Sequence, residues 1–506
     1  MTTKQRILAF EEQKNILLND PYRPLYHLAL LNQYGLPGDP NGGFYANGRY
    51  HMMFLYEDIE VGYKWAHLST TDLLHWRHHK DAIGPTKHTG GCFSGGGFVE
   101  NDKAYLTYWQ LPIGYSNHTS LKGTGIGIAE ASGPVFEDFV KRDDLIIESD
   151  EFGYIDFKND QGDLTESIGA SDPSNIWKHN GKYYILTGNL QVLDKHGRNP
   201  DSKEEYKGDF ASLFESHDLI HWTYKHRFYQ RDQTNQFTEV SEDSMCASFL
   251  PLPSTRLGGK LSDKHLLLFI SHNFGCQYYV GTYKDDHFYP ELHGRLSSYN
   301  REFFAPEAIM DQNNRQIFMA WLGLNLETEI EKGWSGVYSI PRTVWYENDE
   351  FKMAPIDEIK RLRYQATSFN NVLIDKEGFR PKINLDAVEI EFNLMKNLKV
   401  ILYNKKDETQ YTSLYIDYDK EELIIDSTHS NSKGIKKIDF IQIKTVSIFK
   451  SRLFIDKGIL ELFIGDKYAI MKRLYLDYES AIKFESTREI KMNKIVVHDL
   501  MPTNPF

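Results

Sequence analysis

The sequence predicts an all-β protein, with a five-bladed β-propeller followed by a C-terminal β-sandwich. Three observations lead to this fold class. An aromatic hairpin pattern recurs five times, two of its units carry near copies of a second motif, and the pattern of alternation changes after about residue 360. We therefore expect a helical lead-in over 1–25, a propeller over 26–360 and a sandwich over 361–506.

The recurring unit is a short apolar or aromatic strand, a polar turn and a second aromatic strand, which is typical of a β-hairpin. Its copies begin at Gly42, Ser94, Ser174, Ala247 and Glu307. The spacing between copies leaves room for two more strands in each unit. Because such units cannot bury both faces alone, they favour radial closure into a propeller over a sandwich array or a β-helix.

The second motif indicates where the outer strands of the repeated unit lie. Leu68–His79 and Phe214–Lys225 are near copies of each other and lie at matching places in the first and third units. Each copy contains a His-Trp pair, His75-Trp76 or His221-Trp222. We interpret these pairs as residues that pack the strands and that recur because the unit is repeated.

The sequence pattern differs at the two ends of the chain. After Pro341–Gln365 many short runs alternate apolar and polar residues, which predicts an antiparallel sandwich. No low-complexity linker precedes it, so the two domains are expected to pack rigidly. The first residues predict a short amphipathic helix whose apolar members are Ile7, Leu8, Phe10, Ile16 and Leu17.

Composition excludes several classes of partner. A net charge of −13 argues against nucleic acid, and no apolar run is long enough for a membrane-spanning helix.

Cys92, Cys246 and Cys276 share no metal-ligand spacing and favour a reducing compartment. Without a visible signal peptide the chain is expected to be cytoplasmic, although a trimmed secreted or periplasmic protein would look the same. We expect no cofactor, no metal and a carbohydrate substrate, and leave the oligomeric state open.

Acidic residues stand just before the first, third, fourth and fifth hairpins: Asp39, Asp172, Glu242 with Asp243, and Glu307. A single Asp-Pro pair such as Asp39-Pro40 is usually turn chemistry. In a propeller, however, the starts of the inner strands converge on the axis, so these carboxylates would raise one another's pKa. Glycoside hydrolysis requires such a pair, one group to attack and one to protonate the leaving oxygen. No His lies at a ligand spacing beside them, which disfavours a metal.

The motifs resemble, in chain order and over nearly the whole chain, those of glycoside hydrolase family 32, the invertases, inulinases, levanases and fructan-active enzymes. The matching segments are GDPNGG from Gly38, KWAHLSTTDLLHW from Lys64, FSGG from Phe93, ASDPS from Ala170, EDSMC from Glu242, FFAPE from Phe303 and WSGVYSIPR from Trp334.

The resemblance implies a retaining glycosidase that cleaves β-fructofuranosidic bonds by double displacement. Asp39 would be the nucleophile, Glu242 the general acid/base, and Asp172 the group that stabilises the transition state. The residues expected to bind substrate are Asn41, Trp65, Phe93, Ser94, Ser171, Asp243, Glu307 and Trp321.

The chain also departs from the family pattern. The Asn before the nucleophile is Gly38, a Gln of the next strand is Leu55, and the Arg of the R-D-P motif is Ser171. Met245 precedes Cys246 where the family has Glu, so the acid/base role moves to Glu242 in an E-D-x-x-C motif, or to Asp243.

These departures leave alternatives open. The chain could be a fructotransferase that forms transfer or difructose anhydride products, a propeller glycosidase of arabinofuranosidase or xylosidase type, or a non-catalytic carbohydrate-binding relative. The sequence does not decide linkage preference, endo or exo action, or the natural substrate.

Overall fold

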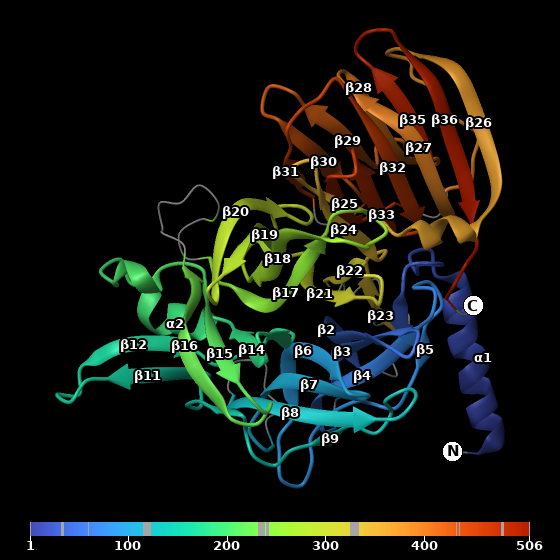
Figure 1. Cartoon of the computed structure of the whole chain (residues 1–506). Coiled ribbons are helices and arrows are strands. Elements are labelled where there is room, and N and C mark those ends of the chain that lie inside the picture. The colour runs from blue at the N-terminus through green and yellow to red at the C-terminus, as the bar shows by residue number, and fades with distance from the viewer. Residues whose placement is uncertain are drawn as a thin grey trace.

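A computed structural model describes residues 2–31, 35–58, 60–114, 123–230, 238, 242–323, 333–431, 433–434, 436–476 and 480–504. Figure 1 shows two β-rich bodies and one long helix, α1 (Thr3–Asn19), along the outside. The predicted all-β class, with a propeller followed by a sandwich, is confirmed. Within the described ranges, no helix is both long and apolar enough to cross a membrane.

Five sheets of four or more strands follow one another in the described part of the N-terminal body. The first holds β2 (Leu36–Ala46), β3 (Arg49–Asp58), β4 (Gly62–Thr70) and β5 (Arg77–His78). The second holds β6 (Cys92–Glu100), β7 (Lys103–Gln110), β8 (Gly125–Ser132), β9 (Val140–Lys141) and β10 (Ile147–Glu148). The third holds β13 (Trp177–His179), β14 (Lys182–Thr187), β15 (Phe210–Ser216) and β16 (Trp222–Gln230).

The fourth sheet holds β17 (Met245–Pro253), β18 (Leu261–Ser271), β19 (Gly275–Lys284) and β20 (His287–Arg295). The fifth holds β21 (Phe303–Met310), β22 (Gln316–Leu322), β23 (Trp334–Tyr338), β24 (Arg342–Glu347) and β25 (Glu350–Pro355). The N-terminal strand β1 (Ala29–Leu31) pairs with β23, so the first strand of the chain joins the last of these sheets. The number of blades stays a prediction, which this succession of sheets supports.

The hairpin turns explain why the repeat was visible in the sequence. Asn47-Gly48, Asn101-Asp102 and Asn180-Gly181 connect the first two strands of three sheets, and all six residues have positive φ. Two-residue turns with this backbone match the twist of the flanking strands, and Asn, Asp and Gly tolerate it best. The predicted hairpins are confirmed at these positions. A separate hairpin, β11 (Tyr154–Lys158) and β12 (Leu164–Gly169), projects from the body in Figure 1, and the short α2 (Leu190–Val192) follows β14.

The C-terminal body is a sandwich of two antiparallel sheets. One holds β26 (Arg363–Ile374), β27 (Ala387–Met395), β32 (Ile448–Asp456), β33 (Ile459–Ile464), β34 (Tyr468–Arg473) and β36 (Ile490–Leu500). The other holds β28 (Leu398–Asn404), β29 (Tyr411–Asp417), β30 (Glu422–His429), β31 (Ile438–Gln442) and β35 (Ser480–Ser486). Their inward-facing aliphatic side chains form one core, which accounts for the alternation in the sequence.

The two bodies share a continuous apolar core and a buried ionic network. Phe454, Phe463 and Met471 of the sandwich belong to the same cluster as the fifth-sheet core. Arg342 donates to Glu461 Oε1 at 2.9 Å from Nε, and both side chains are fully buried. The peptide that connects the propeller to β26 is the short 3-10 helix η5 (Asp357–Leu362). The predicted domain limits themselves stay predictions.

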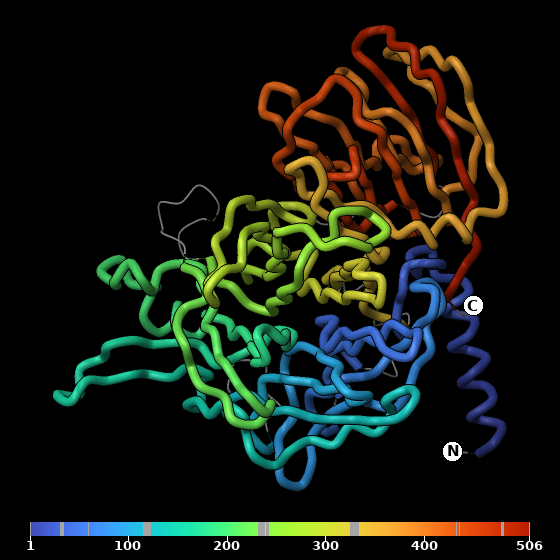
Figure 2. Tube along the Cα trace, viewed as in Figure 1, coloured from blue at the N-terminus to red at the C-terminus, as the bar shows by residue number. Residues whose placement is uncertain are grey.

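The N-terminal segment is tied to the same network. His27 Nδ1 lies 2.9 Å from Asp456 Oδ2, and its Nε2 lies 3.3 Å from Glu461 Oε2. Burial alone would lower the pKa of His27, but these two carboxylates raise it to about 9. The C-terminal residues lie against the N-terminal segment as well, since Thr503 donates its backbone N–H to the Leu25 carbonyl. Figure 2 shows that end of the chain beside the N-terminal segment.

Helix α1 forms as predicted, with Thr2 and Gln5 in a capping box. Its apolar residues do not share a buried face, however. Leu17 is buried, whereas Ile7, Leu8 and Phe10 are 52%, 52% and 76% exposed. The amphipathic pattern expected for this helix is therefore wrong, because only Leu17 of these four apolar residues is buried.

We expect Glu461→Gln to destabilise the protein by about 3–5 kcal/mol, because it leaves the buried Arg342 guanidinium without a counter-charge. Urea unfolding followed by tryptophan fluorescence measures this change. Glu408→Gln is the matched control, since that carboxylate is 58% exposed and its ion pair with Arg380 is worth under about 1 kcal/mol. Equal losses in the two variants would contradict the role given to Glu461.

Candidate active site

Four inner strands carry a β-bulge close to their first residues. The register of each strand with its neighbour shifts between Pro37 and Pro40, Cys92 and Gly95, Met245 and Ser248, and Phe304 and Glu307. A bulge bends the strand and re-aims the side chains of the extra residues. The re-aimed pairs are Gly38-Asp39, Phe93-Ser94, Cys246-Ala247 and Ala305-Pro306.

Backbone strain accompanies this arrangement. Cys246 and Ala305 have φ of +50° and +47°, and Asp172, just before the third sheet, has φ of +40°. These conformations cost free energy for non-glycine residues, so they persist only where the surrounding structure enforces them. These three strained residues therefore lie where the chain enters the sheets.

One cavity of about 300 Å³ collects residues from three of these bulges, on β2, β6 and β17, together with Asp172. Its polar lining comes from different elements: Asp39 on β2, Ser94 on β6, Asp172 before β13, Cys246 on β17 and His272 directly after β18. Its aromatic lining consists of Tyr63, Phe93, Trp109, Phe304 and Trp321. A concave site with aromatic walls and a few convergent polar groups is typical of small-molecule binding.

Two carboxylates meet around a thiol in this cavity. Cys246 Sγ lies 3.8 Å from Asp39 Oδ2 and 3.6 Å from Asp172 Oδ2. Ser94 donates its hydroxyl to Asp39 Oδ2 at 2.6 Å. Asp172 Oδ1 is buried, and no residue in the described part of the chain donates a hydrogen bond to it. A buried acceptor left open in this way fits a ligand hydroxyl.

The surroundings raise the pKa of both carboxyl groups. Burial raises the pKa of Asp39, while the Ser94 hydrogen bond and the charge of His272 oppose that shift. Burial, and then the nearby charge of Asp39, raise the pKa of Asp172 to about 7. Two like charges in a desolvated cavity titrate as a pair, so ionisation of one carboxyl makes ionisation of the other less favourable.

The acids before the fourth sheet point elsewhere. Glu242 is fully buried, and it is not among the residues that line the cavity. Its Oε1 accepts from Arg295 Nη2 at 3.0 Å and its Oε2 accepts from Gln277 Nε2 at 2.5 Å. Asp243 is also fully buried and accepts from His272, from Nδ1 at 2.8 Å and from the backbone N–H at 3.0 Å.

Besides Asp243, four other predicted substrate-binding residues lie outside the lining, and their polar atoms bond other groups of the protein. Asn41 donates to the Asp39 carbonyl at 2.9 Å and accepts from Gly95 N at 3.0 Å, which joins β2 to β6. Trp65 Nε1 donates to the Phe93 carbonyl at 3.1 Å. Ser171 donates to Gln191 Oε1 at 2.5 Å, and Glu307 accepts from Gly43 N and from Ser248 Oγ at 3.2 Å.

The predicted set therefore divides in two. Asp39, Asp172, Phe93, Ser94 and Trp321 line the cavity, whereas the other predicted residues do not. The lining also contains residues that the sequence analysis did not place there: Tyr63, Trp109, Cys246, His272 and Phe304. Cys246 carried a signal, since it ends the E-D-x-x-C motif, but His272 followed an ordinary apolar strand and carried none.

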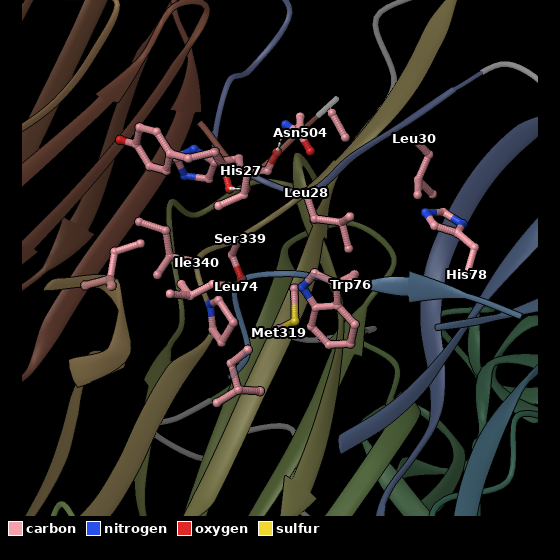
Figure 3. A pocket seen from close by; sticks show the side chains of 16 residues that line it. His27, Leu28, Leu30, Leu74, Trp76, His78, Met319, Ser339, Ile340 and Asn504 are labelled. Atoms are coloured by element: carbon pink, nitrogen blue, oxygen red, sulfur yellow. Dashed lines mark hydrogen bonds between the residues drawn. The ribbon is translucent and has the colours of Figure 1, made fainter. Parts of the chain in front are cut away.

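A second cavity, of about 310 Å³, lies between the N-terminal segment and the propeller, and Figure 3 shows its lining side chains. Its walls are mostly apolar, with Leu28, Leu74, Trp76 and Met319 among them, and its His27 is held by the carboxylates of the domain contact. None of the described residues that line it carries a carboxylate, so among them there is no acid pair like that of the first cavity. Across the described ranges, no group of three His, Cys, Asp or Glu side chains is placed to hold a metal ion.

Comparison with protein-family models gives two matches that together span most of the chain. Residues 30–355 match the glycosyl hydrolases family 32 N-terminal domain, and residues 358–499 match the glycosyl hydrolases family 32 C-terminal domain. Among curated proteins, the chain is 23% identical to sucrose-6-phosphate hydrolase from Zymomonas mobilis, over 94% of this chain and 92% of that protein. It is also 23% identical to raffinose invertase from Escherichia coli, over 90% of each.

Solved structures show the same fold. Fructan 1-exohydrolase IIa from Cichorium intybus superposes with a TM-score of 0.75 at 19% identity, over 96% of this chain and 98% of that one. Sucrose-6-phosphate hydrolase from Lactobacillus gasseri superposes with a TM-score of 0.73 at 19% identity, over 98% and 97%.

Glu307 makes a testable contribution to stability. Burial raises its pKa to about 8 from an ordinary value of 4.5, so between these values the folded state holds a proton that the unfolded chain has released. Glu307 therefore lowers stability as pH rises through that window, by at most about 1.4 kcal/mol per pH unit. We expect Glu307→Gln to flatten the fall of the thermal midpoint between pH 4.5 and 8. The exposed Glu408→Gln should keep the wild-type slope, and an unchanged slope in Glu307→Gln would refute this assignment.

Proposed function

Because the chain belongs to glycosyl hydrolase family 32, we propose that it is a β-fructofuranosidase that hydrolyses sucrose or fructans in the bulge-lined cavity, with retention at the anomeric carbon. The observation that carries the proposal is the pair Asp39 and Asp172, both at family motif positions, on either side of the Cys246 thiol. Curated relatives over nearly the whole chain are hydrolases of sucrose-6-phosphate and an invertase of raffinose.

Asp39 is assigned as the nucleophile. Ser94 holds its Oδ2, whereas no described residue donates to Oδ1, so Oδ1 is the oxygen with a free lone pair for attack on the anomeric carbon. Attack requires the ionised form. The Ser94 hydrogen bond and the positive charge of His272 favour that form against the burial that raises the pKa of Asp39.

Asp172 is assigned to binding and to stabilisation of the transition state. Its buried Oδ1 has no partner in the described ranges, and fructosyl hydroxyl groups would supply the missing donors. Those bonds strengthen as positive charge develops on the sugar ring, because the carboxylate then faces an oxocarbenium-like group in a desolvated cavity. The aromatic walls, Trp109 and Trp321 among them, supply apolar faces for the sugar.

The charge of the lining favours a neutral fructoside over a phosphorylated one. No Lys or Arg is among the described residues that line the cavity, whereas Glu57 is at its wall. A phosphate group is usually held by Arg, Lys or a cluster of backbone N–H groups. We therefore propose that unphosphorylated sucrose or fructan is preferred, and expect kcat/KM for sucrose to exceed that for sucrose 6-phosphate.

The family residues that this chain lacks affect whether the enzyme hydrolyses a fructoside or transfers its fructosyl group to another sugar. Gly38 and Leu55 both line the cavity, so apolar surface stands where the resemblance expects polar fructose contacts. A chromatographic product profile on sucrose, inulin and levan separates free fructose from transfer products and one linkage from the other.

We expect Asp39→Asn to lower fructose release from sucrose, inulin and levan by at least about 10³-fold, because the amide cannot form the glycosyl ester. Enzymatic fructose assays measure the rates, and circular dichroism checks that the variant folds. Asp138→Asn is the control, since that carboxylate is 81% exposed on the surface. A wild type that forms neither fructose nor transfer product from the three substrates would refute the proposed function.

A further inference from the structure

The motif position before Cys246, where the family resemblance expects the acid that protonates the leaving oxygen, carries no carboxylic acid in this chain. Met245 stands at the motif position before Cys246, and its Sδ lies against the backbone N–H of Leu190 at 3.4 Å. Glu242 lies outside the lining, with an Arg295 guanidinium on one carboxylate oxygen and a Gln277 amide on the other. Both arrangements leave the proton transfer to another group of the cavity.

His272 is placed beside the vacant motif position. Ile270 is the cross-strand partner of Met245, so the turn that begins at His272 lies next to Met245 and Cys246. The imidazole lines the cavity, its side chain is 32% exposed, and it meets Phe304 edge-on with ring centroids 5.6 Å apart.

Asp243 fixes the orientation of this ring. Its fully buried carboxylate accepts from His272 Nδ1 at 2.8 Å and from the His272 backbone N–H at 3.0 Å. Nδ1 is therefore committed to Asp243, whereas Nε2 receives no hydrogen bond from the described residues. An imidazole held through one nitrogen by a carboxylate presents the other nitrogen for proton transfer.

We propose that His272, held by Asp243, is the general acid/base of this site; this proposal rests on the proposed β-fructofuranosidase function. In the first step Asp39 Oδ1 forms a bond to the anomeric carbon as the glycosidic C–O bond breaks. The leaving oxygen takes the electron pair of that bond and the proton of His272 Nε2, and it departs as an alcohol.

In the second step a water oxygen attacks the same carbon and gives one proton to the neutral His272 Nε2. The ester bond to Asp39 breaks and returns its electron pair to the carboxylate. Fructose leaves, and both residues regain their starting protonation. The net reaction is fructoside plus water to fructose plus alcohol.

The charges around the ring support this role. Burial alone would lower the pKa of His272, but Asp243, before β17, raises it together with Asp172, before β13, and Asp39, on β2. The net shift is upward from the ordinary 6.5. This shift favours the imidazolium form, which is the form that a general acid requires.

His272→Gln provides the main test, with sucrose and 4-nitrophenyl β-D-fructofuranoside as substrates. A sugar leaving group needs a proton, whereas 4-nitrophenolate leaves as an anion. We therefore expect kcat/KM for sucrose to fall by about 10²–10⁴-fold and kcat/KM for the aryl fructoside to change little. Added azide should accelerate turnover of the aryl fructoside and yield fructosyl azide in this variant but not in the wild type, and the alkaline fall of the sucrose pH profile should disappear.

Asp243→Asn tests the positioning role and serves as the second variant should His272→Gln not fold. Loss of that carboxylate should move the alkaline fall of kcat/KM for sucrose to lower pH. Glu242→Gln and Asp172→Asn test the competing donors, and neither should give azide-accelerated turnover of the aryl fructoside.

The proposal is overturned if His272→Gln keeps the wild-type rate and alkaline fall on sucrose, or if Glu242→Gln or Asp172→Asn shows the azide response instead. An unmoved alkaline fall in Asp243→Asn overturns the positioning role. These failures differ from failure of the proposed function, which would appear as an inactive wild type or as an Asp39→Asn variant that remains active on both substrates.

Discussion

The repulsion between two buried carboxylates is the constraint on which the arrangement of the site depends. Asp39 and Asp172 both approach the Cys246 thiol from different sheets, in a cavity walled by aromatic rings. In such surroundings two full negative charges are costly, and the pKa of each carboxyl is raised. The neighbouring groups relieve this cost: the Ser94 hydroxyl donates to Asp39, and His272 contributes a positive charge that lowers the pKa of both carboxyls.

The fold creates that constraint through its strand starts. Bulges at the beginnings of β2, β6 and β17 turn side chains out of the ordinary pleat and toward one cavity, and Asp172 reaches it from a left-handed backbone. Strain of this kind persists only in a rigid frame. Pairing of β1 with β23, together with the buried contact between Arg342 and Glu461, joins the N-terminal segment, the fifth sheet and the sandwich into that frame.

Much of the fold was readable from the sequence because it is local and repeated. The Asn-Gly and Asn-Asp turns predicted the hairpins. Apolar and polar residues alternate along the sandwich strands because each sheet buries only one of its faces. Asp39 and Asp172 were identified for the same reason, since each immediately precedes a recognisable hairpin. Helix α1 was predicted as a helix, but its packing was not, because packing depends on which surface the rest of the protein offers.

The rest of the site could not be read in this way, because it depends on register. Asn41, Trp65, Ser171 and Glu307 have the residue types of sugar contacts, yet their polar atoms are used by the protein's own backbone and side chains. His272 is 29 residues from Asp243 along the chain, and the two meet only because β17 and β18 pair with Met245 opposite Ile270. No spacing rule in the sequence contains that pairing.

Replacing a carboxylic acid by an imidazole in the acid/base role changes the electrostatics of the whole cavity. A third carboxyl beside Asp39 and Asp172 would share their protons, and its acid form would be neutral. The acid form of His272 is a cation, so the state that donates the proton also favours the ionised nucleophile. Once the proton has left, the positive charge of His272 is gone. Asp39 has then become a neutral ester, so it no longer repels the Asp172 carboxylate. In the proposed mechanism the same histidine thus couples proton donation to the charge state of Asp39, the proposed nucleophile.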